Sequence, residues 1–272
     1  HCAAWANSKP SYFSRSGTSS KLIDLPPEWR LELFDTVDST NAEAARRARG
    51  GAAAGLVIAS SCQTAGRGRS GRSWSTAGSD LALSILLRPS MQPGEAAKVA
   101  FVAALAVYDF AAGILPKSVP LTIKWPNDIL IGDAKLSGIL AEASGGIGGT
   151  VEWLIVGIGV NLRPAERPEA KNPIDLVTAG GRELALEDAA KKLLWEFDKW
   201  QRRWTLDGFG PIREAWKNRT RNLGEIVMAR LPAETIVGRA VDLADDGALI
   251  LALQDGQERR ITAGDIFPID TE

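Results

Sequence analysis

The stretch TAGRGRSGRSWS, residues 64–75, and the residues on either side of it decide how this chain folds. Its glycines spell G-x-G-x-x-G, as in dinucleotide-binding turns, and G-x-x-x-x-G-R-S is one residue away from a P-loop. Both motifs need a helix to begin at the glycines, because the free N–H groups of a helix N-terminus bind phosphate. Here GLVIASSCQ (55–63) and SDLALSILLRP (79–89) predict strands on both sides. The loop therefore joins two strands, and both motif interpretations fail.

Three arginines, Arg67, Arg69 and Arg72, remain to be explained in this loop. A guanidinium group binds a phosphate or a carboxylate through two parallel hydrogen bonds, so a flexible glycine loop carrying three of them could hold an anion. The alternative is a solvated basic hairpin tip, which is the usual role of surface arginines. The loop alone leaves both interpretations open.

Composition restricts the chemistry. The chain has 272 residues, 45% of them hydrophobic and 24% charged, which is typical of a globular enzyme. A formal net charge of −1 does not indicate a protein that coats nucleic acid. The single histidine, His1, excludes Ser-His-Asp and Cys-His catalysis and histidine-based metal sites, and two cysteines give no zinc spacing and no disulfide framework. Catalysis must use lysine, arginine, carboxylates, amides or the backbone.

The N-terminal region and the most apolar segment indicate where in the cell the protein is found. Residues 1–29 predict a disordered leader without the apolar stretch of a secretory signal. The most apolar run, residues 99–108, is too short to span a bilayer and predicts a buried helix. We expect a cytoplasmic protein with no membrane partner.

The main domain, expected over residues 30–219, predicts an α+β fold. A strand at 29–39 leads into a helix that a Thr40–Glu43 capping box begins and two glycines at 50–51 end. Further helices are expected at 96–113 and 186–204. Strands are expected at 121–131, broken by Pro126, and at 135–144 and 151–162. Strands joined by short turns indicate a mixed or antiparallel sheet with helices to one side.

The pattern changes at about residue 220. Short alternating segments follow, separated by the hairpin signals Asp246-Gly247 and Asp255-Gly256. Residues 220–272 therefore predict a small β-barrel, which would have a marginal core by itself.

Four segments, taken in order, carry a family resemblance. They are DSTN (38–41), QTAGRGRSGRSW (63–74), KWPNDI (124–129) with KLSGIL (135–140), and GIGVN (157–161). Together they resemble biotin–protein ligase, the bacterial biotin–[acetyl-CoA-carboxylase] ligase. The resemblance implies a catalytic domain like that of class II aminoacyl-tRNA synthetases and an SH3-like C-terminal barrel. About thirty residues before the core are too few for the DNA-binding domain of some members, so we expect the enzyme-only form, without nucleic acid as a partner.

The resemblance also implies a reaction. Biotin and ATP form biotinyl-5′-AMP and pyrophosphate, and a lysine of a biotin carboxyl carrier protein then takes the biotin. Two other functions stay open: a lipoate–protein ligase or octanoyl transferase, and a non-catalytic biotin sensor. Dimers are common in the family, and a homodimer stays open too.

Site residues follow from the resemblance, motif by motif. Lys135 and Arg69 are implied as catalytic. Biotin binding is implied for Ser39, Thr40, Asn41, Gln63, Gly66, Arg67, Gly68, Arg69, Lys135, Gly157 and Gly159. Nucleotide binding is implied for Arg67, Arg69, Arg72, Trp74, Lys124, Asn127 and Asn161, and Mg²⁺ binding for Asp128.

Ordinary structural roles compete with several of these assignments. Residues 39–41 begin a helix, Lys135 could be a surface lysine, and Trp74 could be a core residue. Cys62 has no histidine to activate it, so we expect a buried apolar residue.

Overall fold

A seven-stranded sheet forms the main domain of the computed structural model, which describes residues 24–74, 76–167 and 170–269. Its strands are β1 (Arg30–Val37), β2 (Leu56–Gln63), β3 (Thr76–Leu87), β4 (Leu121–Lys124), β5 (Asp128–Ile131), β6 (Ala134–Gly145) and β7 (Val151–Val160). They lie in the order β1-β2-β3-β7-β6-β5-β4. β1 and β2 pair in parallel and the other neighbours are antiparallel, so the sheet is mixed.

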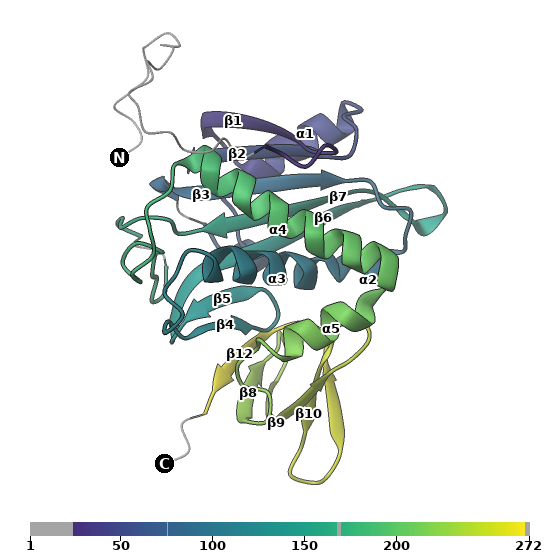
Figure 1. Cartoon of the computed structure of the whole chain (residues 1–272). Coiled ribbons are helices and arrows are strands. Elements are labelled where there is room, and N and C mark those ends of the chain that lie inside the picture. Colours follow the sequence, from purple (N-terminus) through teal and green to yellow (C-terminus); the bar gives the residue numbers. More distant parts are fainter. Residues whose placement is uncertain (1–23, 75, 168–169, 270–272) are drawn as a thin grey trace.

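Helices cover the two faces of this sheet unequally. The long helices α3 (Val99–Ala112) and α4 (Leu186–Asp207) pack on one face, preceded by the short α2 (Pro93–Ala97). The other face carries α1 (Thr40–Arg49), which packs mainly on β2, β3 and β7 and reaches β6 through Asn41 at its start (Figure 1). Part of that second face is therefore left open.

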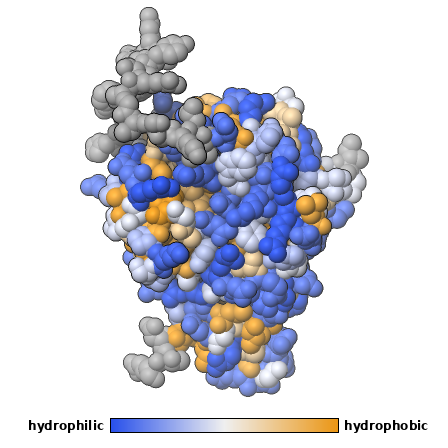
Figure 2. All heavy atoms as spheres, in the orientation of Figure 1, coloured by the Kyte–Doolittle hydropathy of each residue, from blue (hydrophilic) through white to orange (hydrophobic). Residues whose placement is uncertain are grey.

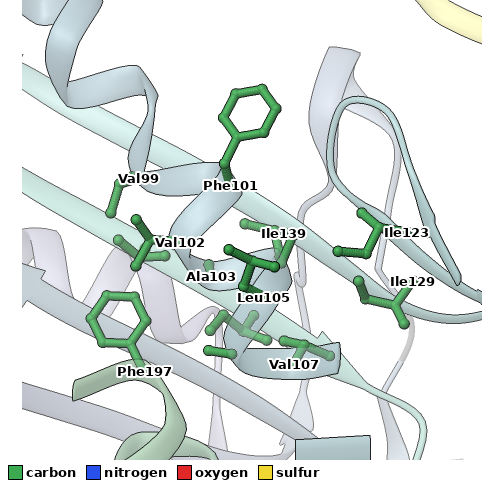
Figure 3. Packing of buried hydrophobic residues seen from close by; sticks show 14 of the residues in the cluster. Val99, Phe101, Val102, Ala103, Leu105, Val107, Ile123, Ile129, Ile139 and Phe197 are labelled. Atoms are coloured by element: carbon green, nitrogen blue, oxygen red, sulfur yellow. The ribbon is translucent and has the colours of Figure 1, made fainter. Parts of the chain in front are cut away.

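The apolar core explains this arrangement. Val99 to Ala112 is buried on almost every side, as a helix between a sheet and another helix must be. Its side chains meet Ile139 of β6 and Phe197 of α4 (Figure 3). The predicted buried helix at 99–108 is confirmed.

A second sheet forms the C-terminal part. Its strands are β8 (Ile226–Arg230), β9 (Thr235–Leu243), β10 (Leu249–Ala252), β11 (Glu258–Ile261) and β12 (Asp265–Pro268), in the antiparallel order β11-β10-β9-β8-β12. Both predicted hairpin turns are found, with Gly247 and Gly256 at positive φ. The small antiparallel unit agrees with the expected SH3-like barrel. Apolar side chains gather over it on the face in Figure 2, whereas the surface over α4 is mostly hydrophilic.

The two sheets are packed together and share one core. Helix α5 (Phe209–Lys217) lies between them (Figure 1), and its Trp216 is fully buried. The indole N–H of Trp125, just after β4, donates to the carbonyl of Gly247 in the β9–β10 turn at 3.1 Å. A Cβ at Gly247 would lie 2.6 Å from the Phe101 ring of α3, so the turn backbone sits directly on the main domain.

Several local expectations were wrong. The N-cap of α1 is Ser39, whose hydroxyl accepts from the N–H of Ala42, so Thr40 is the first helical residue and Glu43 pairs instead with Arg46 and Arg47. The helix expected at 96–113 is two helices that meet at Lys98. Helix α5 was not predicted.

The N-terminal side differs from the expected leader where it is described. Trp29 is buried, and its indole N–H donates to Asp198 of α4 at 2.7 Å. Residues 24–29 thus pack on the main domain, while 1–23 lie outside the described residues. The limits 30–219 and 220–272 stay predictions.

In the part of the chain that is described, no helix combines the length and the apolar character needed to cross a membrane.

Candidate functional site

A cleft of about 760 Å³ opens on the face of the sheet that α1 covers only in part. Alternate residues of a strand point to opposite faces, and on this face β7 presents Trp153 and Ile155 beneath α1 and then Gly157 and Gly159. The side chains of β3 on this face also become smaller, from Leu86 beneath α1 to Ala82 in the cleft. The shift from large to small side chains creates the hollow.

The cleft brings together nearly all the residues expected at the site. Those that line it are Ser39, Thr40, Asn41, Gln63, Arg67, Gly68, Arg69, Arg72, Trp74, Lys124, Asn127, Asp128, Lys135, Gly157, Gly159 and Asn161. Gly66 is the exception. It is buried, and a Cβ there would lie 2.3 Å from the carbonyl oxygen of Trp74, so this glycine lets the loop close on itself.

The N-terminus of α1 forms one end of the cleft and is a closed hydrogen-bond network. Gln63 Oε1 accepts from the backbone N–H of Thr40 at 2.8 Å and from its hydroxyl at 3.1 Å. Asn41 donates from Nδ2 to Glu142 Oε2 at 2.6 Å and accepts from the Ser84 hydroxyl at 2.6 Å. These groups hold fixed orientations, so this end is preorganised.

Two glycines of β7 make room for this network and for the loop. A Cβ at Gly157 would lie 2.2 Å from Asn41 Oδ1, and one at Gly159 would lie 2.2 Å from the indole of Trp74. Trp74 also lies over Gly138 of β6, 3.0 Å from a Cβ built there. Its indole therefore rests on a strip of backbone at the cleft floor.

The arginine loop crosses the cleft as a tight hairpin. The N–H of Trp74 donates to Gly66 and that of Gly68 to Arg72, while Ser70 and Gly71 at the tip have positive φ. A 3₁₀ turn, Arg69–Gly71, stands between the two strands, so the predicted strand–loop–strand order is confirmed.

The three arginines of the loop have different partners. Arg67 Nη2 lies 3.2 Å from Glu142 Oε1, and Arg72 Nη2 lies 2.8 Å from Asp265 Oδ2 of β12. Arg69 donates to the neutral amide oxygen of Asn127 at 3.0 Å. Burial lowers the pKa of Arg69, although a guanidinium keeps its charge at neutral pH.

Lys135 is held from both sides. Its Nζ lies 2.7 Å from Asp128 Oδ1 and 5.6 Å from the centre of the Trp74 ring. Its backbone carbonyl accepts from the Nδ2 of Asn161, whose other donated bond goes to Ile174. Asn161 thus fixes the strand that carries Lys135, in addition to lining the cleft.

The C-terminal sheet supplies the far wall of the cleft. The Phe267 ring has two cations beside it, with Lys124 Nζ 5.1 Å and the Arg230 guanidinium carbon 4.9 Å from its centre. Burial lowers the pKa of Lys124 below that of an ordinary lysine.

The cleft and near-cleft residues that sequence reasoning missed include Ser84, Glu142, Arg230, Asp265 and Phe267. None belongs to the four motifs. Period-2 alternation from Gly138 could have placed Glu142 on the cleft face of β6, but the three from the C-terminal sheet are positioned only by docking of the two sheets. Cys62 is buried, as expected.

A divalent cation has few protein ligands here. The described residues hold no cluster of three or more His, Cys, Asp or Glu side chains suited to a metal ion. Asp128 lines the cleft with one carboxylate, which suits Mg²⁺ only if phosphate oxygens and water complete its shell.

Comparisons with known proteins agree with this geometry. Residues 33–161 match the Biotin/lipoate A/B protein ligase family, and residues 223–267 match the Biotin protein ligase C terminal domain. A biotin–[acetyl-CoA-carboxylase] ligase of Paracoccus denitrificans is 39% identical over 240 residues, covering 86% of this chain and 99% of its own length. One from Mycobacterium tuberculosis is 32% identical over 255 residues, covering 90% of this chain and 92% of its own.

Solved structures show the same fold. The biotin protein ligase of Aquifex aeolicus in complex with biotin and ATP superposes with a TM-score of 0.73 at 26% identity, covering 87% of this chain and 97% of that one. From these matches, and from the four motifs gathered in one cleft, we conclude that the chain belongs to the biotin protein ligase family.

Proposed function

We propose that this protein is an ATP-dependent ligase that activates biotin as biotinyl-5′-AMP and transfers it to a lysine of a biotin carboxyl carrier protein. The observation that carries the proposal is the pairing, in one cleft, of a fixed hydrogen-bonding end at α1 with an arginine loop and two lysines. The first suits a neutral polar ring and the second suits phosphates.

In the first step the biotin carboxylate attacks the α-phosphorus of ATP, and pyrophosphate leaves. Two anions must approach each other, so fixed positive charge at the developing charge lowers the barrier. Lys135 and Arg69 are the cations we assign to this role, because both line the cleft and are held there, Arg69 by its bond to Asn127 and Lys135 by the bond of Asn161 to its carbonyl. No step needs an imidazole.

Biotin binding is assigned to the α1 end. Its ureido ring would bond with groups from Ser39, Thr40, Asn41 and Gln63, over the floor at Gly157 and Gly159. Asn41 and Gln63 already use several of their hydrogen-bonding atoms within the protein, so a ligand must bond to what remains or displace a partner.

The loop has a protective role in this proposal. Arg67, Gly68, Arg69 and Arg72 lie over the cleft, and Trp74 packs at its floor near the position proposed for adenine, with Lys124, Asn127 and Asn161 nearby. A mixed anhydride hydrolyses easily, so a closed loop that excludes water would preserve it.

In the second step the amine of the acceptor lysine attacks the biotinyl carbonyl carbon and AMP leaves with the bonding electron pair. The attacking nitrogen must lose a proton, and we assign Asp128, a carboxylate that lines the cleft beside Lys135, to accept it. Mg²⁺, when bound with ATP, would neutralise phosphate charge, with Asp128 as its candidate protein ligand.

The test uses the purified chain with biotin, ATP and a biotin carboxyl carrier domain. We expect the carrier to gain one biotinyl mass and the enzyme to catalyse biotin-dependent exchange of pyrophosphate into ATP. No mass gain and no exchange would reject the proposal, and the same reactions with lipoate would identify a lipoate ligase. Exchange without transfer would point to another acceptor. The cytoplasmic location and a homodimer stay predictions.

A further inference from the structure

We propose that Arg230, Phe267 and Lys124 form a subsite, at the junction of the two sheets, for the outer phosphates of the nucleotide and for pyrophosphate. This rests on the proposed function, since it names where the leaving group of the first step is held. Two of its three residues come from the C-terminal sheet, outside the four motifs.

The subsite has a built geometry. Arg230 and Phe267 lie on neighbouring strands, where Arg230 pairs with Asp265 and Met228 with Phe267. The Phe267 ring makes two cation–π contacts: its centre lies 4.9 Å from the guanidinium carbon of Arg230 and 5.1 Å from Nζ of Lys124. An aromatic ring attracts cations without neutralising them, so both groups stay beside Phe267 while their charges remain available.

Lys124 and Arg230 differ from most other cations of the cleft in having no carboxylate close enough to form an ion pair. Arg67, Arg72 and Lys135 each have a carboxylate oxygen within 4.0 Å. Arg230 and Lys124 have none among the described residues, and Arg69 contacts only a neutral amide. Asp128 and Asp265 attract Lys124 only from beyond that distance, so an anion bound in the cleft would supply the close counter-charge that Lys124 and Arg230 lack.

The nearby carboxylates do not cancel this charge. Both oxygens of Asp265 accept from Arg72, at 2.8 and 2.9 Å, and Asp128 is paired with Lys135. The wall around Phe267 therefore presents net positive charge to the cleft. A polyphosphate matches two or three convergent cations better than a single carboxylate does.

The experiment compares Arg230→Gln with Arg259→Gln. Arg259 is an exposed arginine of the same sheet that pairs with Glu234 and lies outside the cleft. Binding of pyrophosphate alone is measured by calorimetry, and KM values for ATP and biotin come from the pyrophosphate exchange reaction, which needs no acceptor protein. Phe267→Leu is a second variant that removes the ring and leaves both charges.

We expect Arg230→Gln to weaken pyrophosphate binding and raise the KM for ATP about three- to tenfold, with the KM for biotin unchanged. Phe267→Leu should do the same to a smaller degree, and Arg259→Gln should do neither. Unchanged pyrophosphate binding in an active, folded Arg230→Gln protein would overturn the subsite, as would a change confined to the KM for biotin. Absence of exchange in the unmodified protein would instead reject the proposed function.

Discussion

The two ends of the cleft satisfy their polar groups in opposite ways. At the α1 end, Thr40 donates to Gln63, and Asn41 bonds to Ser84 and Glu142, so each of these side chains has a partner within the protein. At the C-terminal-sheet end, Lys124 and Arg230 lie near a ring and face the cleft without a carboxylate. The first end recognises shape and hydrogen bonds, and the second depends on a ligand to supply its negative charge.

The largest effect should come from the lysine between the two ends. Lys135→Ala removes a fixed cation from the reacting centre, so kcat for adenylate formation should fall roughly 100- to 1000-fold. Lys135→Arg should lose less, and the exposed Lys117→Ala should match the unmodified protein. Rapid-quench measurement of biotinyl-5′-AMP gives the rates. A loss below tenfold in Lys135→Ala would remove this residue from the catalytic group.

A change in the loop should show that adenylate retention depends on unpaired charge. Arg69→Gly deletes the loop cation that has no carboxylate partner, so bound biotinyl-5′-AMP should escape about tenfold faster, as loss of one charged contact implies. Escaped adenylate would label bystander lysines, which mass spectrometry detects. Arg182→Gly, on another exposed loop, is the control. An unchanged release rate would contradict the role given to Arg69.

A change at the floor tests the opposite end. Gly157→Ala would place a Cβ against Asn41 Oδ1, so the free energy of unfolding should fall by about 1–3 kcal/mol. The KM for biotin should rise about tenfold while the KM for pyrophosphate stays constant. Gly145→Ala, a β6 glycine with open space around its Cβ position, is the matched control. Equal effects on both substrates would mean that the two ends are not independent.

The smallest effect concerns pH. Burial lowers the pKa of Lys124, so its charge is lost, as pH rises, at a lower pH than in an ordinary lysine. The KM for ATP should therefore rise on the alkaline side, by about two- to fivefold, since partly exposed charges contribute up to about 1 kcal/mol. Lys124→Arg keeps its charge and should move this rise to higher pH. Identical profiles of the KM for ATP against pH in the two proteins would show that the charge of Lys124 does not contribute to nucleotide binding.

Sequence and structure agree where local patterns decide the outcome. The strand–loop–strand reading of residues 55–89 follows from alternation and is confirmed, as are both C-terminal hairpins. The start of α1 was placed one residue late because a T-x-x-E pattern and a Ser N-cap overlap in DSTNAE. Hydrophobic periodicity alone could not show the break at Lys98, because helix α3 is apolar on almost every side.

The missed part of the site has a different cause. Arg230, Asp265 and Phe267 lie over a hundred and fifty residues after the arginine loop and belong to short strands without a motif. Their position depends on how two sheets dock, through the Trp125–Gly247 bond and the Phe101 contact, and no local pattern encodes that. Ser39, Thr40 and Asn41 could be read from one motif because they are neighbours in the chain.

The bond from Trp125 to the β9–β10 turn has a consequence for biosynthesis. A nascent chain still lacking its last fifty residues already contains every strand of the large sheet and the whole α1 network. It lacks Arg230, Phe267 and the turn that seats them against the cleft. A prematurely terminated product would thus keep the residues of the α1 end but lose Arg230 and Phe267, and it would leave uncovered the apolar surface that the two sheets share.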